Sequence, residues 1–262
     1  MRAGHEAVGC HRDGAILRIE ICNPPSNALD NNISRALGEA FRTFRDDPEL
    51  RVAVLSAKGN AFSSGAEHGI HPYRETCFGE HGVGGFGGLQ ELQALNKPVV
   101  ACLQGPAVDA GMELALACDL IYASDTASFT LSALDKGDIC AGAAIRLPRR
   151  VPYHIAMEML YTGRTMEARE AQRWGLVNDV LPSAELVAKV DALARTLAAG
   201  PPLVFAAIKE VARVSDGEAF QTTMNRVTRR QLPTVDALYG SQDMIEGFKA
   251  FAEKRAPVWQ GR

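Results

Sequence analysis

The sequence predicts an α/β fold in which an alternating strand–helix core is followed by a helical C-terminal region. Apolar strand patterns and amphipathic helix patterns alternate along the first half of the chain, which favours a mostly parallel sheet. After about residue 147 the periodicity becomes helical throughout. A chain of 262 residues that is 47% hydrophobic can form one large core with a smaller appendage. We therefore divide the chain into a core at 1–200 and a helical region at 201–262.

The individual elements follow from local patterns taken in chain order. The strands are expected where short apolar or alternating runs occur, at 15–21, 51–57, 98–103 and 120–124. The helices are expected at 33–47, from Ala110 onward, at 154–163, 165–175 and 183–200, from Pro202 onward, and at 217–231 and 241–254. In the helix at 183–200, Ser183 is the expected N-cap and Gly200 the expected stop.

Composition excludes several classes of function. The net charge of −3 gives no reason to expect nucleic-acid binding, which usually needs a clearly basic surface, but it leaves room for a local basic pocket for a phosphorylated ligand. The N-terminal residues lack the apolar core of a secretory leader, and no run approaches the ~18 apolar residues that a membrane span needs. The six cysteines show no C-x-x-C pairing, so we expect reduced thiols, no zinc site and a cytoplasmic location. These cysteines are Cys10, Cys22, Cys77, Cys102, Cys118 and Cys140.

Two stretches with weak motifs are interpreted as loops. Gly82, Gly84 and Gly87 have G-x-G-x-x-G spacing, but the residues before them do not form the strand that a dinucleotide loop needs. We interpret 81–89 as a mobile loop and, if it has a function, as a lid over a pocket. His68 and His71 have no third ligand nearby, so solvated histidines are favoured over a metal pair.

The strongest local signal is GPAVDAGMELALACDL at 105–120. Helix N-termini leave their first amides without partners and carry partial positive charge. Small residues at Ala110 and Gly111 leave those amides open to a ligand oxygen, with Glu113 in the same first turn. The alternative is that Glu113 only complements the helix dipole. A second stretch of small residues, AFSSGAEHG at 61–69, also allows a ligand to approach the backbone closely.

Together these stretches resemble the two signature segments of the crotonase, or enoyl-CoA hydratase/isomerase, family. NPPSNALD, LYTGRTMEAREAQRWGLVNDVLP and EGFKAFAEKRAPVWQGR are similar to further family segments in the same order, so the resemblance covers nearly the whole chain. It implies a crotonase-like ββα spiral core and a helical C-terminal trimerisation region, giving a homotrimer or a dimer of trimers. It also implies an acyl-CoA thioester substrate and no cofactor beyond the CoA moiety.

The resemblance assigns roles to several residues. The backbone amides of Ala66 and Ala110 match the oxyanion hole for the thioester oxygen, and Glu113 matches one of two catalytic carboxylates. Ser64 matches a backbone contact to the CoA adenine. Phe251 and Lys254 match contacts to adenine and the 3′-phosphate made from a neighbouring subunit, although Lys254 is equally interpretable as a solvated helix lysine.

The chain departs from the family pattern beside this site. The segment FTLSALDKG lacks the F-x-x-P-E phrase, and Ala133 stands where the second glutamate is expected. Asp138 or Asp135 are candidates to replace it, with Ala133 and Asp138 in the acyl pocket. Asp109 stands where the family usually has glycine, and we interpret it as a helix N-cap. The expected function is an enoyl-CoA hydratase/isomerase-type enzyme with Glu113 as acid/base. An isomerase, a hydrolase, a decarboxylase or a non-catalytic acyl-CoA binder are the alternatives.

Overall fold

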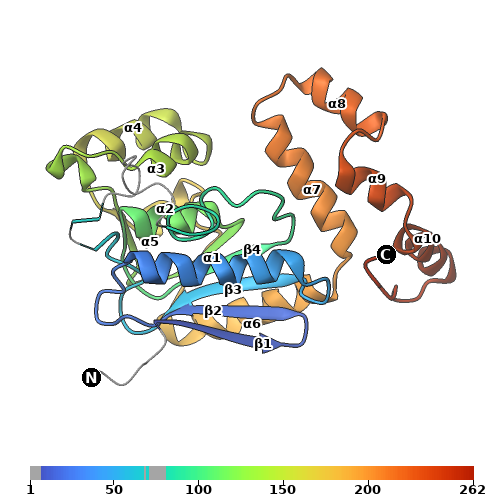
Figure 1. Ribbon diagram of the computed structural model, residues 1–262, viewed down its shortest axis with the longest axis horizontal. Coiled ribbons are helices and arrows are strands. Elements are labelled where there is room, and N and C mark those ends of the chain that lie inside the picture. The colour runs from blue at the N-terminus through green and yellow to red at the C-terminus, as the bar shows by residue number, and fades with distance from the viewer. Residues whose placement is uncertain (1–6, 68, 71–80) are drawn as a thin grey trace.

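A six-stranded sheet forms the centre of the computed structural model, which describes residues 7–67, 69–70 and 81–262 (Figure 1). The strand order is β1-β2-β3-β4-β6-β9, with β1 antiparallel to β2 and every other pair parallel. The strands are β1 Val8–Asp13, β2 Ile16–Ile21, β3 Val52–Ala57, β4 Val99–Leu103, β6 Leu120–Ser124 and β9 Asp179–Leu181. The apolar runs predicted as strands all lie in this sheet, which confirms the expected α/β core.

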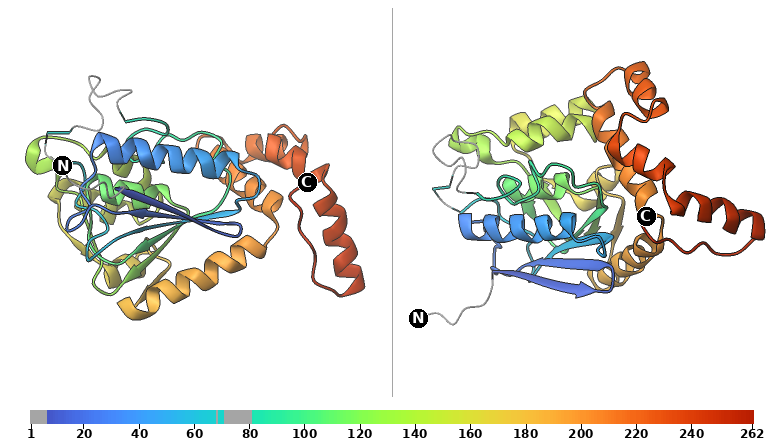
Figure 2. Two further views of the ribbon diagram at one scale, coloured as in Figure 1. Left: turned by 60° about the horizontal axis from the view of Figure 1, so that its bottom comes forward. Right: turned by 45° about the vertical axis from the view of Figure 1, so that its right-hand side comes forward.

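Helices cover both faces of the sheet. Helix α1 (Asn31–Asp46) lies on one face and α6 (Ser183–Ala199) on the other (Figures 1 and 2). Side chains alternate between the faces as strand geometry requires. Ala53 and Leu55 of β3 belong to the large core that also contains the apolar residues of α1, whereas Val52 and Val54 pack with α6. A buried strand between two helical layers explains why β3 is apolar almost throughout.

A second, three-stranded sheet stands beside the main one and supports the region of interest. It consists of β5 (Ala107–Val108), β7 (Ser128–Thr130) and β8 (Met166–Glu167), in the order β5-β7-β8. Helix α2 (Ala110–Ala117) begins directly after β5, and α3 (Ala141–Arg146) packs against α2. Between β7 and α3, the chain forms a 3₁₀ turn, η2 (Ala133–Lys136).

The C-terminal helices extend away from the core. Beyond η3 (Leu147–Arg149), the remaining helices are α4 Tyr153–Thr162, α5 Ala168–Arg173, α7 Pro202–Ser215, α8 Phe220–Thr228, α9 Pro233–Tyr239 and α10 Gln242–Glu253. Helices α7 to α10 form an arm that extends away from the sheet (Figures 1 and 2). No helix in the described residues is both long and apolar enough to cross a membrane.

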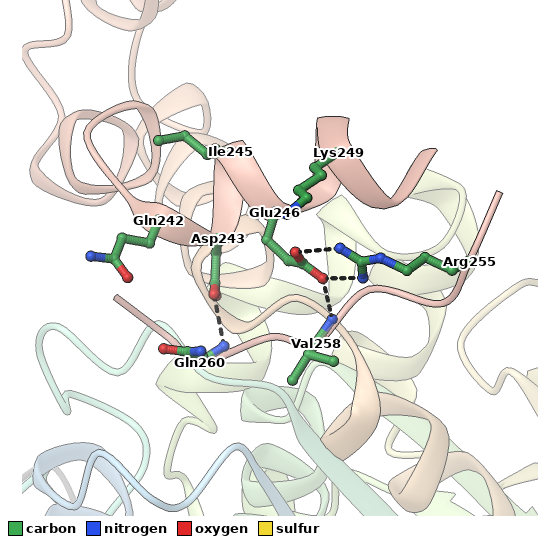
Figure 3. Close-up of a pocket in the computed structure, with 8 residues that line it drawn as sticks. All are labelled: Gln242, Asp243, Ile245, Glu246, Lys249, Arg255, Val258 and Gln260. Carbon is green, nitrogen blue, oxygen red and sulfur yellow. Dashed lines mark hydrogen bonds and ion pairs between the residues drawn. The ribbon is translucent and has the colours of Figure 1, made fainter. Parts of the chain in front are cut away.

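The chain end is fastened onto α10 by charge-assisted hydrogen bonds (Figure 3). Arg255 donates two hydrogen bonds to the Glu246 carboxylate, at 2.6 and 2.8 Å, and the Val258 amide donates a third at 2.9 Å. Asp243 accepts from the amide of Gln260 at 2.7 Å. The hydrogen bonds from Arg255 and then Val258 lower the pKa of Glu246 to about 2. We call residues 255–262 the C-terminal strap.

Some sequence predictions need correction at element ends. Ser183 is not the N-cap of α6, because Pro182 takes that position and its carbonyl accepts from Glu185 and Leu186. Strand β1 was not predicted, since VGCHRD is an edge strand with mostly exposed side chains and no apolar alternation. Gly200 ends α6 as expected.

Candidate active site

Two turns that are distant in sequence lie side by side at the start of α2. Ser63 forms a parallel bridge with Ala107, and the Val108 amide donates to the Ser63 carbonyl at 2.9 Å. A Cβ atom on Gly65 would lie only 3.0 Å from the Val108 oxygen and 3.5 Å from the Ala110 nitrogen. Glycine at position 65 therefore allows the two turns to touch.

The first of these turns is held from its other side by residues 23–30. The buried Asn27 side chain donates to the carbonyls of Lys58 and Ala61, at 2.9 and 2.7 Å, and its backbone carbonyl accepts from the Ser63 hydroxyl at 2.8 Å. The Leu29 amide donates to the Gly65 carbonyl, and the Leu29 carbonyl accepts from the amide of Glu67, the residue after Ala66. The backbone around Ala66 is thus fixed without using the Ala66 amide.

The amides of Ala66 and Ala110 are open donors. Ala66 is half-buried, Ala110 is buried as the first residue of α2, and neither amide meets an acceptor in the described part of the chain. Unpaired buried amides are rare in folded proteins, because each costs about as much as a lost hydrogen bond. Both lie on the two touching turns, where they remain available to an external acceptor.

Glu113 lies in the first turn of α2 and is only 2% exposed. Its Oε1 accepts from the Ala143 amide of α3 at 3.0 Å. The neighbouring Ala144 lines a cavity of about 230 Å³. Glu113 itself does not line this cavity, but a buried carboxylate oriented by a backbone donor is a suitable group for proton transfer.

Asp109 occupies the N-cap position of α2 as predicted, but its side chain makes no capping hydrogen bond to the helix. Its φ of 46° and ψ of −116° turn the side chain away from the helix. Its Oδ1 accepts from the amides of Ser132 and Ala133, at 2.5 and 3.0 Å, and its Oδ2 accepts from the Ser132 hydroxyl at 3.1 Å. The negative charge thus faces η2 rather than the open amides.

The cavity beside Glu113 is largely apolar, and it contains the predicted acyl-pocket residues. Ala133 and Asp138 both line it, whereas Asp135 is exposed and does not. Asp138 accepts from the amide of Ile139 at 2.8 Å. The other lining residues are Leu131, Leu134, Ile139, Cys140, Ala144, Met157, Leu160 and Tyr161. Asp138 is the one carboxylate among these lining residues.

The Cys140 thiol contacts the Asp109 carboxylate and lies near enough to Glu113 to be affected by its charge. Its sulfur lies 3.7 Å from Asp109 Oδ1, and burial, followed by the charges of Glu113 and Asp109, raises the pKa of the thiol. The thiol therefore stays protonated and acts as a weak donor. The cysteines that the structure describes are free thiols, while Cys77 lies outside the described residues.

The remaining predicted residues lie apart from this centre. Ser64 is exposed on the first turn, and its amide donates to Ser26 at 2.9 Å. Phe251 is 85% exposed near the end of α10, and Lys254 follows that helix. Because α10 lies beyond the core in every view (Figures 1 and 2), neither residue reaches the turns within one chain.

The glycine-rich stretch at 81–89 is anchored rather than open. The Ser34 hydroxyl donates to the carbonyl of His81 at 2.7 Å and accepts from the Gly87 amide at 3.0 Å. No described residue of this stretch lines the cavity beside Glu113, whereas Leu89 lines a separate one, so a role of 81–89 as a lid stays a prediction. His68 and His71 lie outside the described residues. In the part of the chain that is described, no three His, Cys, Asp or Glu side chains gather as metal ligands.

Comparison with known proteins shows the family of the chain. Residues 11–262 match the family model described as enoyl-CoA hydratase/isomerase. The chain belongs to the enoyl-CoA hydratase/isomerase family. The curated relatives of this family include a carnitinyl-CoA dehydratase of Salmonella typhi, 42% identical over 98% of this chain and 99% of that protein.

Solved structures of the family give the same result for the fold. An enoyl-CoA hydratase from Mycobacterium tuberculosis H37Rv superposes with a TM-score of 0.87 at 32% identity, covering 98% of this chain and 100% of that one. An enoyl-CoA hydratase/carnithine racemase from Magnetospirillum magneticum gives 0.82 at 27% identity, covering 99% and 97%. The predicted crotonase fold with a helical C-terminal region is therefore confirmed.

Sequence reasoning missed two participants in the site, Ser132 and Cys140. Both lie in the segment that departs from the family pattern, and both contact Asp109. The signal was present in the sequence, because glycine is replaced at 109 while proline and glutamate are replaced at 132 and 133.

Proposed function

We propose that the protein is an acyl-CoA lyase of this family, which adds water to, or removes water from, a short acyl thioester with Glu113 as its acid/base. The observation that carries the proposal is the pair of unpaired amides, Ala66 and Ala110, on touching turns beside the buried Glu113. The CoA moiety of the substrate is the only cofactor-like group that this chemistry requires.

The chemistry follows from where charge develops. In the dehydration direction, Glu113 removes the proton from the carbon next to the thioester, and the electron pair moves onto the carbonyl oxygen. The amides of Ala66 and Ala110 stabilise that oxyanion, and one such donor is typically worth ~3 kcal/mol of barrier. The β-hydroxyl then leaves with the proton that Glu113 holds, which releases water and regenerates the carboxylate.

Two further considerations support a lyase with a small substrate. The relatives at 41–42% identity are carnitinyl-CoA dehydratases, whose reaction removes water from an acyl-CoA. The cavity of about 230 Å³ has room for a short acyl group. Ser64, together with Phe251 and Lys254 from a neighbouring subunit, would hold the CoA end in a trimer or a dimer of trimers.

A second candidate has one observation in its favour. Ala133 presents only a methyl group to the cavity, so the site has lost the partner carboxylate that would hold a water molecule. This favours a reaction that needs a single proton shuttle, such as double-bond isomerisation, or acyl-CoA binding without turnover. Thioester hydrolysis and decarboxylation use the same oxyanion hole.

One experiment separates these reactions. The protein is incubated with crotonyl-CoA, a longer enoyl-CoA, carnitinyl-CoA and a carboxylated acyl-CoA, and the products are identified by mass spectrometry. A lyase changes the mass by one water, a hydrolase releases free CoA, a decarboxylase loses CO2, and an isomerase changes only the retention time. Glu113→Gln is expected to lower turnover by ~10²–10⁴ while it leaves CoA affinity unchanged. Unchanged turnover in Glu113→Gln would remove Glu113 from the mechanism.

A further inference from the structure

Three departures from the family pattern meet at one point in the structure. The Asp109 carboxylate binds the amide and hydroxyl of Ser132 and the amide of Ala133. The shortest of these bonds, at 2.5 Å, comes from the Ser132 amide, which the proline of the family pattern could not provide. A glutamate at 133 would bring a second negative charge next to this carboxylate. The contact of Asp109 with this segment therefore depends on an N–H at position 132 and is favoured by an uncharged side chain at position 133.

The backbone of Asp109 has an unfavourable conformation. Asp109 adopts φ 46° and ψ −116°, a region that residues other than glycine rarely occupy. Such conformations persist only where the surrounding structure enforces them. Here the side-chain hydrogen bonds to residues 132 and 133 act together with two backbone bonds, from the Asp109 amide to the Thr130 carbonyl and from the Glu113 amide to the Asp109 carbonyl.

The position of Asp109 gives this contact a consequence for the site. Asp109 immediately precedes Ala110, whose amide is one of the two open donors. Its partner segment, 132–140, supplies one wall of the acyl cavity through Ala133, Asp138 and Cys140. The Cys140 thiol also lies 3.7 Å from Asp109 Oδ1. The Asp109 carboxylate thus links the turn that carries the Ala110 amide to the cavity wall.

We infer that Asp109 is a positioning residue that fixes this wall at a set distance from the thioester oxygen and thereby selects acyl groups by length. The inference rests on the proposed function. Both carboxylate oxygens are occupied by donors of the wall, with Lys136 Nζ another 3.9 Å from Oδ2, so Asp109 acts through the wall rather than by moving a proton.

Hydrogen–deuterium exchange tests the link without any substrate. In Asp109→Gly, exchange in peptides covering 131–140 is expected to rise roughly tenfold or more, because hydrogen bonds to a charged acceptor are lost. Asp109→Asn, which keeps the size of the side chain, is also expected to raise exchange in these peptides. Ser132→Ala removes only the hydroxyl and serves as the matched control, and α6 serves as the internal reference. Unchanged exchange in both Asp109 variants would overturn the inference.

A second measurement tests the effect on the acyl group. The ratio of kcat/KM for crotonyl-CoA over octenoyl-CoA is expected to move about tenfold in Asp109→Gly, whereas a merely structural role would lower both values together. Hydration by Ala133→Glu alone is expected to stay low, and Asp109→Gly with Ala133→Glu is expected to recover it, because the like charges are then separated. Additive effects of these two substitutions would contradict the coupling.

The two proposals fail in different ways. If the wild-type protein neither binds nor converts any acyl-CoA while exchange at 131–140 responds to Asp109, the proposed function fails and the link between Asp109 and the wall stands. If turnover is normal and exchange does not respond, the link fails and the proposed function stands.

Discussion

Replacing Gly111 with alanine tests whether the contact between the two turns is needed for activity. A Cβ at this position would lie 2.7 Å from both the Cβ and the carbonyl oxygen of Ser63, and real Cβ atoms essentially never approach closer than 3.0 Å. The start of α2 must therefore move away from the first turn by at least 0.3 Å, the difference between these values. Because Ala110 is the preceding residue, its amide moves with the helix.

The magnitude follows from two opposing effects on stability and one on rate. Overpacking costs ~1–3 kcal/mol, and alanine in place of a helical glycine returns ~1 kcal/mol. The unfolding free energy should therefore fall only slightly, by about 0–2 kcal/mol. Turnover depends on donor placement, so kcat should fall by at least ~10-fold and approach the ~10² that a lost oxyanion donor costs.

The assay is the decrease in enoyl thioester absorbance, measured beside a urea unfolding curve. Gly217→Ala is the matched control, because a Cβ there meets no atom within 4 Å and both measurements should remain at wild-type values. A Gly111→Ala protein with wild-type kcat would refute the reasoning that the two turns must touch.

Three more outcomes are expected. The pKa of Glu246 is lowered from 4.5 to about 2, so its hydrogen bonds to the C-terminal strap stabilise the folded state above pH 4.5, and this contribution is lost as the pH falls toward 2. Trp259 fluorescence in a Trp174→Phe background should report release of the strap between these pH values, and the Glu246→Gln variant should show no such transition. The protein should sediment as a trimer or hexamer, and Phe251→Glu should shift it toward smaller species; a wild-type monomer would contradict the cross-subunit role of Lys254. Asn27→Ala should lower the unfolding free energy by ~2–4 kcal/mol, since buried hydrogen bonds to Lys58 and Ala61 are lost; an unchanged urea midpoint would count against this.

Local patterns were enough to predict β2, β3, β4 and β6 and the start of α2. The predicted strand at 120–124 coincides with β6, because a short apolar run bounded by polar residues has few alternatives. The Gly-Pro turn and the small residues before Glu113 likewise determine where α2 begins. These features depend on neighbours within a few residues.

Features that depend on distant contacts could not be predicted in this way. The direction of the Asp109 side chain is decided by residues 132 and 133, and capping was the more common alternative for an aspartate before a helix. Strand β1 has almost no buried side chain, so its sequence carries no apolar pattern, and its pairing with β2 defines it instead. The choice of Asp138 over Asp135 as a cavity residue depends on the course of η2.

The proposed oxyanion donors are main-chain atoms, and this has a consequence for how the protein can be probed and can change. Any side chain except proline supplies the same N–H, so an alanine scan would pass over positions 66 and 110 without touching the groups that matter. Replacing either peptide link by an ester, which deletes a single hydrogen and leaves the surface intact, is the direct way to remove one donor. For the same reason, drift at these positions can alter the shape of the pocket while the donors persist.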